Sequence, residues 1–223
     1  MNCIRLTKYY YYRSLRTLKG KGVAALLWAS LRKLKYLLLV TDSADWIWKD
    51  LRDPMLDIKA QKPVQVIFDS KDEIIEWLKE HNPLYSWMYV PEEIKIATSE
   101  KHIFPYVKAN GDIIGYVKIG IKKVYILDYD EIIEFPDKSS FIYDTFVVPE
   151  FRGKNIAPFL LNEAIKYLKD HKFEKIWCHI PSWNTPSRRV FEKLNFQRFA
   201  NVRYLKLLNL KFFTKNPKKF LTK

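Results

Sequence analysis

Between residues 63 and 208 the apolar and polar positions follow the periods of strands and helices in turn. The most specific signal is Asn110-Gly111, because this pair readily adopts the positive φ angles of a type I′ turn and alternating apolar runs flank it. The stretch therefore predicts a β-hairpin within an alternation of strands and helices. Strands are expected at 64–68, 103–108, 113–119, 121–127, 139–148, 174–180 and 196–208, and helices at 70–78, at 157–171 and after Thr185, with Thr185 as the N-cap.

The N-terminal pattern is different. Residues 13–39 are interpreted as a basic helix with a poorly kept polar face, and residues 23–40 form the most apolar run of the chain. Arg32, Lys33 and Lys35 lie near the middle of that run, where charge is most costly for a bilayer-spanning helix, so a transmembrane segment is not predicted. Two fates stay open for this helix: it packs on the domain, or it lies on a membrane surface.

The division of the chain follows from these patterns. Residues 41–62 end in two Xaa-Pro breaks and are interpreted as a connector. We therefore expect a basic, partly apolar helical extension with its connector at 1–62, one main folded domain at 63–210 and a basic C-terminal tail at 211–223.

Composition narrows the class of protein. A chain of 223 residues is long enough for one well-buried domain and an accessory segment, and a hydrophobic content of 48% excludes an intrinsically disordered protein. Cys3 and Cys178 lie far apart and outside any metal-binding spacing, which predicts neither a disulfide framework nor a bound metal. The expected location is therefore the reducing cytoplasm.

The net charge of +14 is concentrated at the two ends. Residues 1–40 hold nine Lys or Arg and no acid, and residues 198–223 hold eight and no acid, so the middle is slightly acidic. A nucleic-acid-binding domain normally carries its basic face on the folded body, so a specific nucleic-acid partner is not expected. The basic ends either hold an anionic surface, such as a membrane, or simply solvate helix faces.

A segment that can hold a phosphate runs from Val147 to Ala157, through a tight turn into a helix. The first amides of a helix lack intrahelical partners and lie at the positive end of the helix dipole, so they bind anions. Gly153 allows close approach of the backbone, and Arg152 and Lys154 add positive charge. The alternative is an ordinary strand-to-helix turn, which does not need this combination.

This turn, Arg152-Gly-Lys-Asn-Ile-Ala157, resembles the R/Q-x-x-G-x-G/A signature of the GNAT N-acetyltransferase superfamily. Asn155 replaces the central glycine and is the non-glycine residue that best tolerates left-handed backbone geometry. The segments 141–149 and 184–196 also resemble the family, in the right order, so the likeness covers about residues 64–208. It implies an α/β (α+β) GNAT fold: a mixed central sheet flanked by helices and splayed as a V between its fourth and fifth strands.

The resemblance also implies a site. Acetyl-CoA or a related acyl-CoA would lie in the V as co-substrate, with its pyrophosphate on the turn and its acyl and pantetheine groups against the backbone of the fourth strand. Asn184 would bond the pantetheine arm, or serve only as a helix-entry residue. The implied cofactor-binding residues are Phe146, Val147, Val148, Arg152, Gly153, Lys154, Asn155, Ile156, Ala157, Asn184 and Ser187.

Direct attack on the thioester requires a neutral amine, and therefore a proton acceptor. Asp144 is the favoured general base because it lies near the strand end where the amine should enter, with Tyr143 and His179 as rivals. Phe191 stands where the family often has a tyrosine acid, so protonation of the thiolate must come from another tyrosine or from water, or is not required.

Two classes of function follow. The first is an N-acyltransferase that acts on a primary amine of unknown identity, and the second is a non-catalytic GNAT-like module that binds acyl-CoA and is tethered to a membrane or another anionic surface. The acceptor is expected to be chosen by the loops at 80–100 and 128–139. The acids Asp128, Asp130, Glu131 and Glu134 either attract a cationic amine or belong to a solvated loop.

Overall fold

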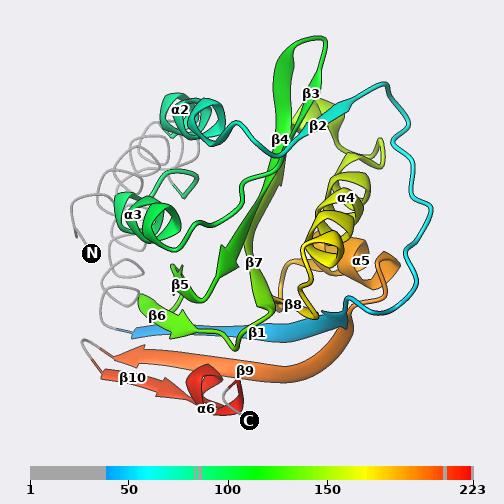
Figure 1. Cartoon of the computed structure of the whole chain (residues 1–223). Coiled ribbons are helices and arrows are strands. Elements are labelled where there is room, and N and C mark those ends of the chain that lie inside the picture. The colour runs from blue at the N-terminus through cyan, green and yellow to red at the C-terminus, as the bar shows by residue number, and fades with distance from the viewer. Residues whose placement is uncertain (1–38, 83, 85–86, 208–209, 222–223) are drawn as a thin grey trace, which may run out of the picture.

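The computed structural model describes residues 39–82, 84, 87–207 and 210–221 (Figure 1). The helix predicted over residues 13–39 lies outside this part of the chain, except for Leu39, which begins a strand.

The described residues build an eight-stranded mixed sheet in the order β10-β9-β1-β8-β7-β4-β3-β2. Neighbouring strands are antiparallel except β7 and β8, which are parallel. This is the predicted α/β fold with a mixed sheet. The strands are β1 (Leu39–Asp50), β2 (Gln65–Ile67), β3 (Tyr106–Ala109), β4 (Asp112–Ile121), β7 (Ser139–Val147), β8 (Lys175–Pro181), β9 (Gln197–Leu207) and β10 (Leu210–Phe213).

Helices cover both faces of the sheet (Figure 1). On one face, α4 (Ile156–Asp170) and α5 (Thr185–Lys193) pack their apolar sides against the strands in the largest core cluster. On the other face, α2 (Lys71–His81) and α3 (Pro91–Ser99) bury residues such as Ile74 and Ala97. The predicted helices at 70–78 and 157–171 and the hairpin at Asn110-Gly111 are therefore present, and both turn residues have positive φ angles.

The interpretation of residues 41–62 as a connector is wrong for its first part. β1 pairs with β8 on one side and with β9 on the other, so it lies inside the sheet. Its Trp46 is completely buried among aromatic side chains of the second core cluster. The strand could not be recognised from the sequence, because polar residues interrupt the alternation of apolar and polar positions in LVTDSADWIWKD. These polar residues find their partners only in the folded sheet.

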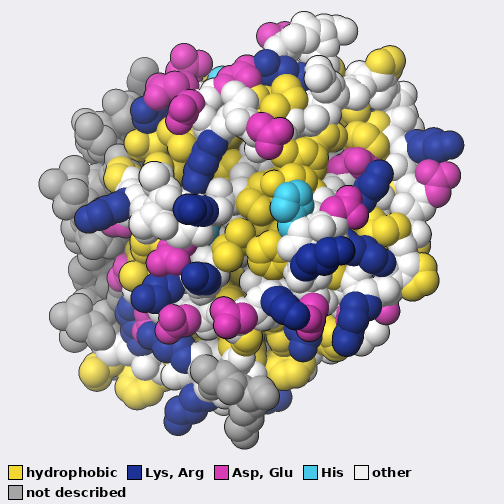
Figure 2. All heavy atoms as spheres, in the orientation of Figure 1, with side chains coloured by type: hydrophobic (Ala, Val, Ile, Leu, Met, Phe, Trp, Pro, Cys, Tyr) yellow, Lys and Arg dark blue, Asp and Glu magenta, His cyan; other side chains and the backbone are white. Residues whose placement is uncertain are grey.

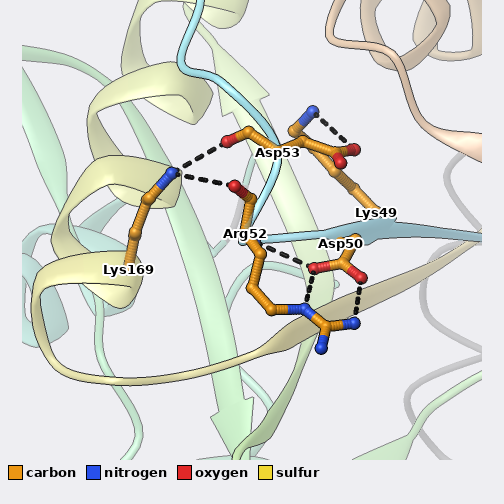
Figure 3. Close-up of polar contacts among 5 residues, drawn as sticks. All are labelled: Lys49, Asp50, Arg52, Asp53 and Lys169. Atoms are coloured by element: carbon orange, nitrogen blue, oxygen red, sulfur yellow. Dashed lines mark hydrogen bonds and ion pairs between the residues drawn. The ribbon is translucent and has the colours of Figure 1, made fainter.

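The chain that leaves β1 is held along α4. Asp50 accepts hydrogen bonds from the Arg52 guanidinium, and Lys169 of α4 donates to the carbonyl of Asp53 at 2.8 Å (Figure 3). Further on, the carbonyl of Leu56 accepts from Nδ2 of Asn162. This segment is therefore bound to the outside of α4 through side chains that are far from it in sequence.

Two further predictions need correction. The strand expected at 121–127 does not continue the central sheet, because β5 (Lys123–Ile126) turns away to pair with β6 (Glu131–Glu134) in a separate two-stranded sheet. The basic tail expected at 211–223 is also folded over its described part: β10 adds an edge strand, and α6 (Pro217–Leu221) buries Leu221 in the second core cluster.

The predicted V lies between β7 and β8. The two strands pair only from Ser139 with Lys175 to Ile142 with Cys178. Beyond that point β7 contains a bulge. Ile142 and Asp144 of β7 pair with the consecutive β4 residues Ile119 and Lys118, so Tyr143 has no paired residue on β4. A bulge bends a strand and shifts its alternation. The remainder of β7 therefore presents an edge that β8 does not pair, and this edge forms one wall of the site.

Positive and negative side chains are mixed on the face of the molecule that Figure 2 draws. Figure 2 shows Lys and Arg side chains interleaved with Asp and Glu over the viewed face. Among the described residues, no helix is long and apolar enough to cross a membrane.

Candidate active site

A cavity of about 560 Å³ lies where β7 leaves β8, between the N-terminal ends of α4 and α5. It collects nine of the eleven residues predicted for the acyl-CoA site. These are Phe146, Val147, Arg152, Gly153, Asn155, Ile156, Ala157, Asn184 and Ser187.

The turn before α4 has the geometry expected for a phosphate-binding loop. Gly153 has φ +76°, and apart from its chain neighbours no atom of the described residues lies within 4 Å of the position that a Cβ would occupy. Asn155 is the N-cap of α4 with φ +61°, the left-handed conformation predicted for it in place of glycine. The first residues of the 15-residue helix α4 line the cavity together with Gly153, which has no side chain to block them. The unpaired amides at the start of this helix are therefore accessible to an anion in the cavity.

The side chain of Asn155 fixes this turn to two other parts of the chain. Its Nδ2 donates to the carbonyl of Lys59 at 2.5 Å, and its Oδ1 accepts from Nζ of Lys193 at 2.7 Å. The amide of Gln61 also donates to the carbonyl of Lys154. A glycine at position 155 could adopt the same backbone conformation but could form neither of these side-chain hydrogen bonds. The departure from the family signature therefore makes the turn more rigid.

Two predicted residues, Val148 and Lys154, do not line this cavity. The amide of Val148 donates to Ile114 and its carbonyl accepts from Phe151, so the backbone of Val148 is bonded within the protein. Nζ of Lys154 donates to the carbonyl of Glu150 and lies over the ring of Phe151. The short 3-10 helix η1 (Pro149–Phe151) lies between these two residues, and the Val148 side chain packs against the third core cluster.

Asn184 serves as a helix cap as well as a wall of the cavity. Its Oδ1 accepts from the amide of Ser187, which makes Asn184 the N-cap of α5. The prediction that Thr185 is the cap is wrong by one residue, because Thr185 is already helical and Pro186 follows it in the first turn. Asn184 still belongs to the cavity lining.

One buried polar atom indicates that the V suits a polar ligand. Oγ1 of Thr145 on β7 is buried, and it has no hydrogen-bond partner among the described residues. Such an atom is costly unless something bonds it. Thr145 lines the cavity at the unpaired edge of β7, so an amide or thioester that lies along this edge would satisfy it. The residues present therefore fit a pantetheine arm.

A second cavity of about 540 Å³ opens on the other side of the V. The two cavities meet at six shared lining residues, which are Thr145, Phe146, Arg152, Asn184, Ser187 and Phe191. Phe191, at the position of the family's tyrosine, is buried at this junction and offers no proton. The remaining walls of the second cavity include acids and aromatic rings, namely Glu93, Asp128, Asp144, Trp87, Tyr125, Tyr143, His179 and Trp183.

Asp144, the predicted base, lies in this second cavity as one member of a buried charged cluster. Its Oδ2 accepts from the hydroxyl of Tyr116 at 2.7 Å and lies 3.4 Å from Nζ of Lys118. Lys118 also bonds Oε1 of Glu93 at 2.6 Å and the carbonyl of Met88 at 2.7 Å. Burial opposes the charge of Lys118, but the two carboxylates outweigh burial and raise its pKa.

Sequence reasoning missed Glu93 and Lys118. The signal for Lys118 was available, since it is the one charged residue between Asp112 and Ile121 in an apolar strand. Glu93 gave no signal, because it follows another glutamate in the first turn of α3 and only the fold turns it inward, to 6% exposure of its side chain. Burial raises the pKa of Glu93 to about 7, although the nearby Lys118 ammonium opposes this.

The two rivals to Asp144 are both present beside the cavity. Burial raises the pKa of Tyr143 well above its ordinary value, and its hydroxyl lies 3.3 Å from Nδ1 of His102. Tyr143 therefore packs as an aromatic side chain against the second and third core clusters. His179 bonds Oδ2 of Asp128 through Nε2 at 2.9 Å, whereas its buried Nδ1 has no partner among the described residues.

Solved structures share this fold at low sequence identity. A GCN5-related N-acetyltransferase from Sphaerobacter thermophilus is 13% identical with a TM-score of 0.57, and the match covers 81% of this chain and 56% of that one. A glucosamine N-acetyltransferase region of a fungal multi-domain β-N-acetylglucosaminidase is 12% identical with a TM-score of 0.51, over 82% and 23% of the two chains. The present chain thus spans little more than half of the Sphaerobacter protein. The likeness defines the class of protein as one with the acetyltransferase fold.

The family follows from the sequence comparison. The acetyltransferase (GNAT) family matches residues 68–196, which is more than half of the 223 residues. The sequence matches no curated protein. The chain therefore belongs to the acetyltransferase (GNAT) family, as the signature at 152–157 predicted, and the family's shared co-substrate is acetyl-CoA.

Proposed function

We propose that this protein transfers an acetyl group from acetyl-CoA to a primary amine by direct attack. The observation that carries the proposal is the pair of cavities that share six lining residues, among them Thr145, Phe146 and Phe191. One cavity has a phosphate-binding turn and an unpaired strand edge, and the other has carboxylates. An acyl donor in the first and an amine in the second would face each other across the V, and such positioning is a large part of acyl-transfer catalysis.

The residues of the first cavity have distinct roles in this proposal. The amides at the start of α4 hold the pyrophosphate, and the edge of β7 around Phe146 and Val147 aligns the pantetheine arm. Oγ1 of Thr145 bonds a polar group of the same arm, because the atom is buried without a hydrogen-bond partner in the described part of the chain. Acetyl-CoA supplies the activated thioester, while the protein orients its carbonyl carbon and excludes water.

The experiment has two arms. Acetyl-CoA should raise the melting temperature of the full chain, and free thiol should be released when a panel of primary amines is added with it. Stabilisation by acetyl-CoA without turnover on any amine would favour the non-catalytic acyl-CoA-binding module. A melting temperature that acetyl-CoA leaves unchanged would contradict both readings of the site.

A further inference from the structure

Three ionisable side chains from three elements meet at the wall of the second cavity. Nζ of Lys118 on β4 lies 2.6 Å from Glu93 on α3 and 3.4 Å from Asp144 on β7. The exposed fractions of the Lys118, Glu93 and Asp144 side chains are 0%, 6% and 17%. The cluster is therefore largely shielded from water, where charge imbalance is costly.

The charges of this cluster do not balance. Lys118 carries one positive charge, and its three N–H groups are engaged by Met88, Glu93 and Asp144. Two carboxylates face it, which leaves one excess negative charge when both are ionised. The other titratable groups that face Glu93 are the phenols of Tyr116, Tyr125 and Tyr143, which are neutral near pH 7 and cannot compensate.

The excess charge faces the cavity. Glu93 and Asp144 belong to its lining, whereas Lys118 does not. His179 supplies an independent observation on the same wall: its ring is buried, Nε2 bonds Asp128, and Nδ1 has no partner among the described residues. With the proton on Nε2 toward the carboxylate, Nδ1 is an acceptor. The cavity thus presents two carboxylates that a ligand rich in N–H donors would satisfy, and beside them the buried ring nitrogen of His179.

We infer that the acceptor amine enters as its ammonium form beside Glu93 and Asp144, and that Glu93 takes one proton from it. This inference rests on the proposed acetyl transfer. The ammonium transfers its proton to a Glu93 oxygen and becomes a neutral amine. The amine nitrogen then forms the bond to the thioester carbon, the C–S bond breaks, and the second nitrogen proton goes with the departing thiolate. Glu93 finally releases its proton to solvent, which restores the cluster.

Glu93 suits this role better than Asp144. Oδ2 of Asp144 accepts from the Tyr116 hydroxyl and also contacts Lys118, so two donors within the protein already engage this oxygen. The carboxylate of Glu93 is held by Lys118 but is more deeply buried, which raises its pKa to about 7. A proton acceptor works best when its pKa lies near the working pH. Asp144 then acts as a positioning residue that supplies the second negative charge.

The experiment is a titration of the full chain labelled with ¹³C at glutamate carboxyl carbons. One carbon should titrate near pH 7, and its signal should be missing in Glu93→Gln but present in Glu92→Gln, a change of the exposed glutamate beside it. Addition of ethylammonium chloride, with sodium chloride as the ionic-strength control, should lower this pKa, because a bound cation favours the carboxylate.

The outcomes separate this inference from the proposed function. The inference is wrong if no glutamate titrates near pH 7, or if this pKa is the same in ethylammonium chloride as in sodium chloride. Either result counts against it even when acetyl-CoA stabilises the protein. With an amine that the protein acetylates, kcat/KM should rise with pH through about 7 in the wild type. Glu93→Gln should lose this limb and about 10²-fold or more in rate. A retained limb in Glu93→Gln would also overturn the inference. Absence of acetyl-CoA binding would instead contradict the proposed function, and the titration would remain readable.

Discussion

Nδ2 of Asn155 donates to the carbonyl of Lys59 across a separation of 96 residues. The bond joins the turn before α4 to the chain that follows β1, so the shape of the phosphate-binding turn depends on a segment outside the family signature. The φ of Asn155, +61°, is closed to proline, whose ring fixes φ near −65°. Asn155 therefore links the local conformation of the turn to the tertiary fold.

Gly153→Val should abolish the rise in melting temperature that acetyl-CoA causes. A β-branched residue at φ +76° costs about 1–3 kcal/mol of strain and places a side chain in front of the helix amides. Gly111→Val is the matched control, because Gly111 also has positive φ and open space but lies in the β3–β4 turn. Thermal shift with and without acetyl-CoA measures both. An undiminished rise in Gly153→Val would place the co-substrate elsewhere.

Thr145→Val should weaken acetyl-CoA binding without loss of stability. The hydroxyl has no partner among the described residues, so its removal from the free protein costs no hydrogen bond and removes a buried polar atom. We expect calorimetry to give a Kd about fivefold weaker, which corresponds to loss of roughly 1 kcal/mol. Unchanged affinity would show that Oγ1 does not contact the pantetheine arm.

Asp144→Asn should reduce turnover by about tenfold, less than Glu93→Gln, while acetyl-CoA stabilisation is kept. Because the Asp144 carboxylate raises the pKa of Glu93, its neutralisation should also move the acid limb of the kcat/KM profile to lower pH. If instead the limb disappears in Asp144→Asn and stays in Glu93→Gln, Asp144 is the proton acceptor that the sequence favoured.

The buried Glu93 should also make stability depend on pH. Its pKa is 4.5 in the unfolded chain and about 7 when folded, so between these values the folded state binds more protons. The free energy of unfolding of the wild type should therefore fall as pH rises from 4.5 through 7, by on the order of 3 kcal/mol relative to Glu93→Gln. Burial lowers the pKa of His102 to about 4, so below pH 6.5 this residue makes the free energy of unfolding rise with pH. The effect is the same in the wild type and in Glu93→Gln and cancels in the comparison. Urea unfolding across this range provides the measurement, and parallel curves for the two proteins would contradict it.

The basic N-terminal segment is predicted to be an attachment to anionic surfaces. A chain that starts at Leu39 should stay soluble and keep acetyl-CoA stabilisation, while the full chain should sediment with phosphatidylserine vesicles at low salt and detach as salt rises. A chain that starts at Pro63 should aggregate, because it lacks β1 from the sheet. If the full chain ignores vesicles at low salt and the Leu39 chain aggregates, the segment belongs to the core.

The sequence by itself determined the elements whose signals are local. The hairpin at Asn110-Gly111, the helix after the glycine turn and the family signature all depend on residues within a few positions of one another. Backbone preference and hydrophobic period therefore suffice to predict them. The tolerance of Asn155 for left-handed geometry is local in the same way, and its φ confirms that prediction.

Only the tertiary structure decided which strands join and which acids are buried. β1 has polar residues such as Asp45, whose partners Arg188 and Arg198 lie more than a hundred residues away, so its alternation could not be read from the sequence. Glu93 and Glu92 are adjacent on one helix, yet α3 turns only Glu93 toward Lys118. Burial and the resulting pKa are properties of long-range packing, and for that reason the proton acceptor inferred from the structure was not among the residues that the sequence proposed.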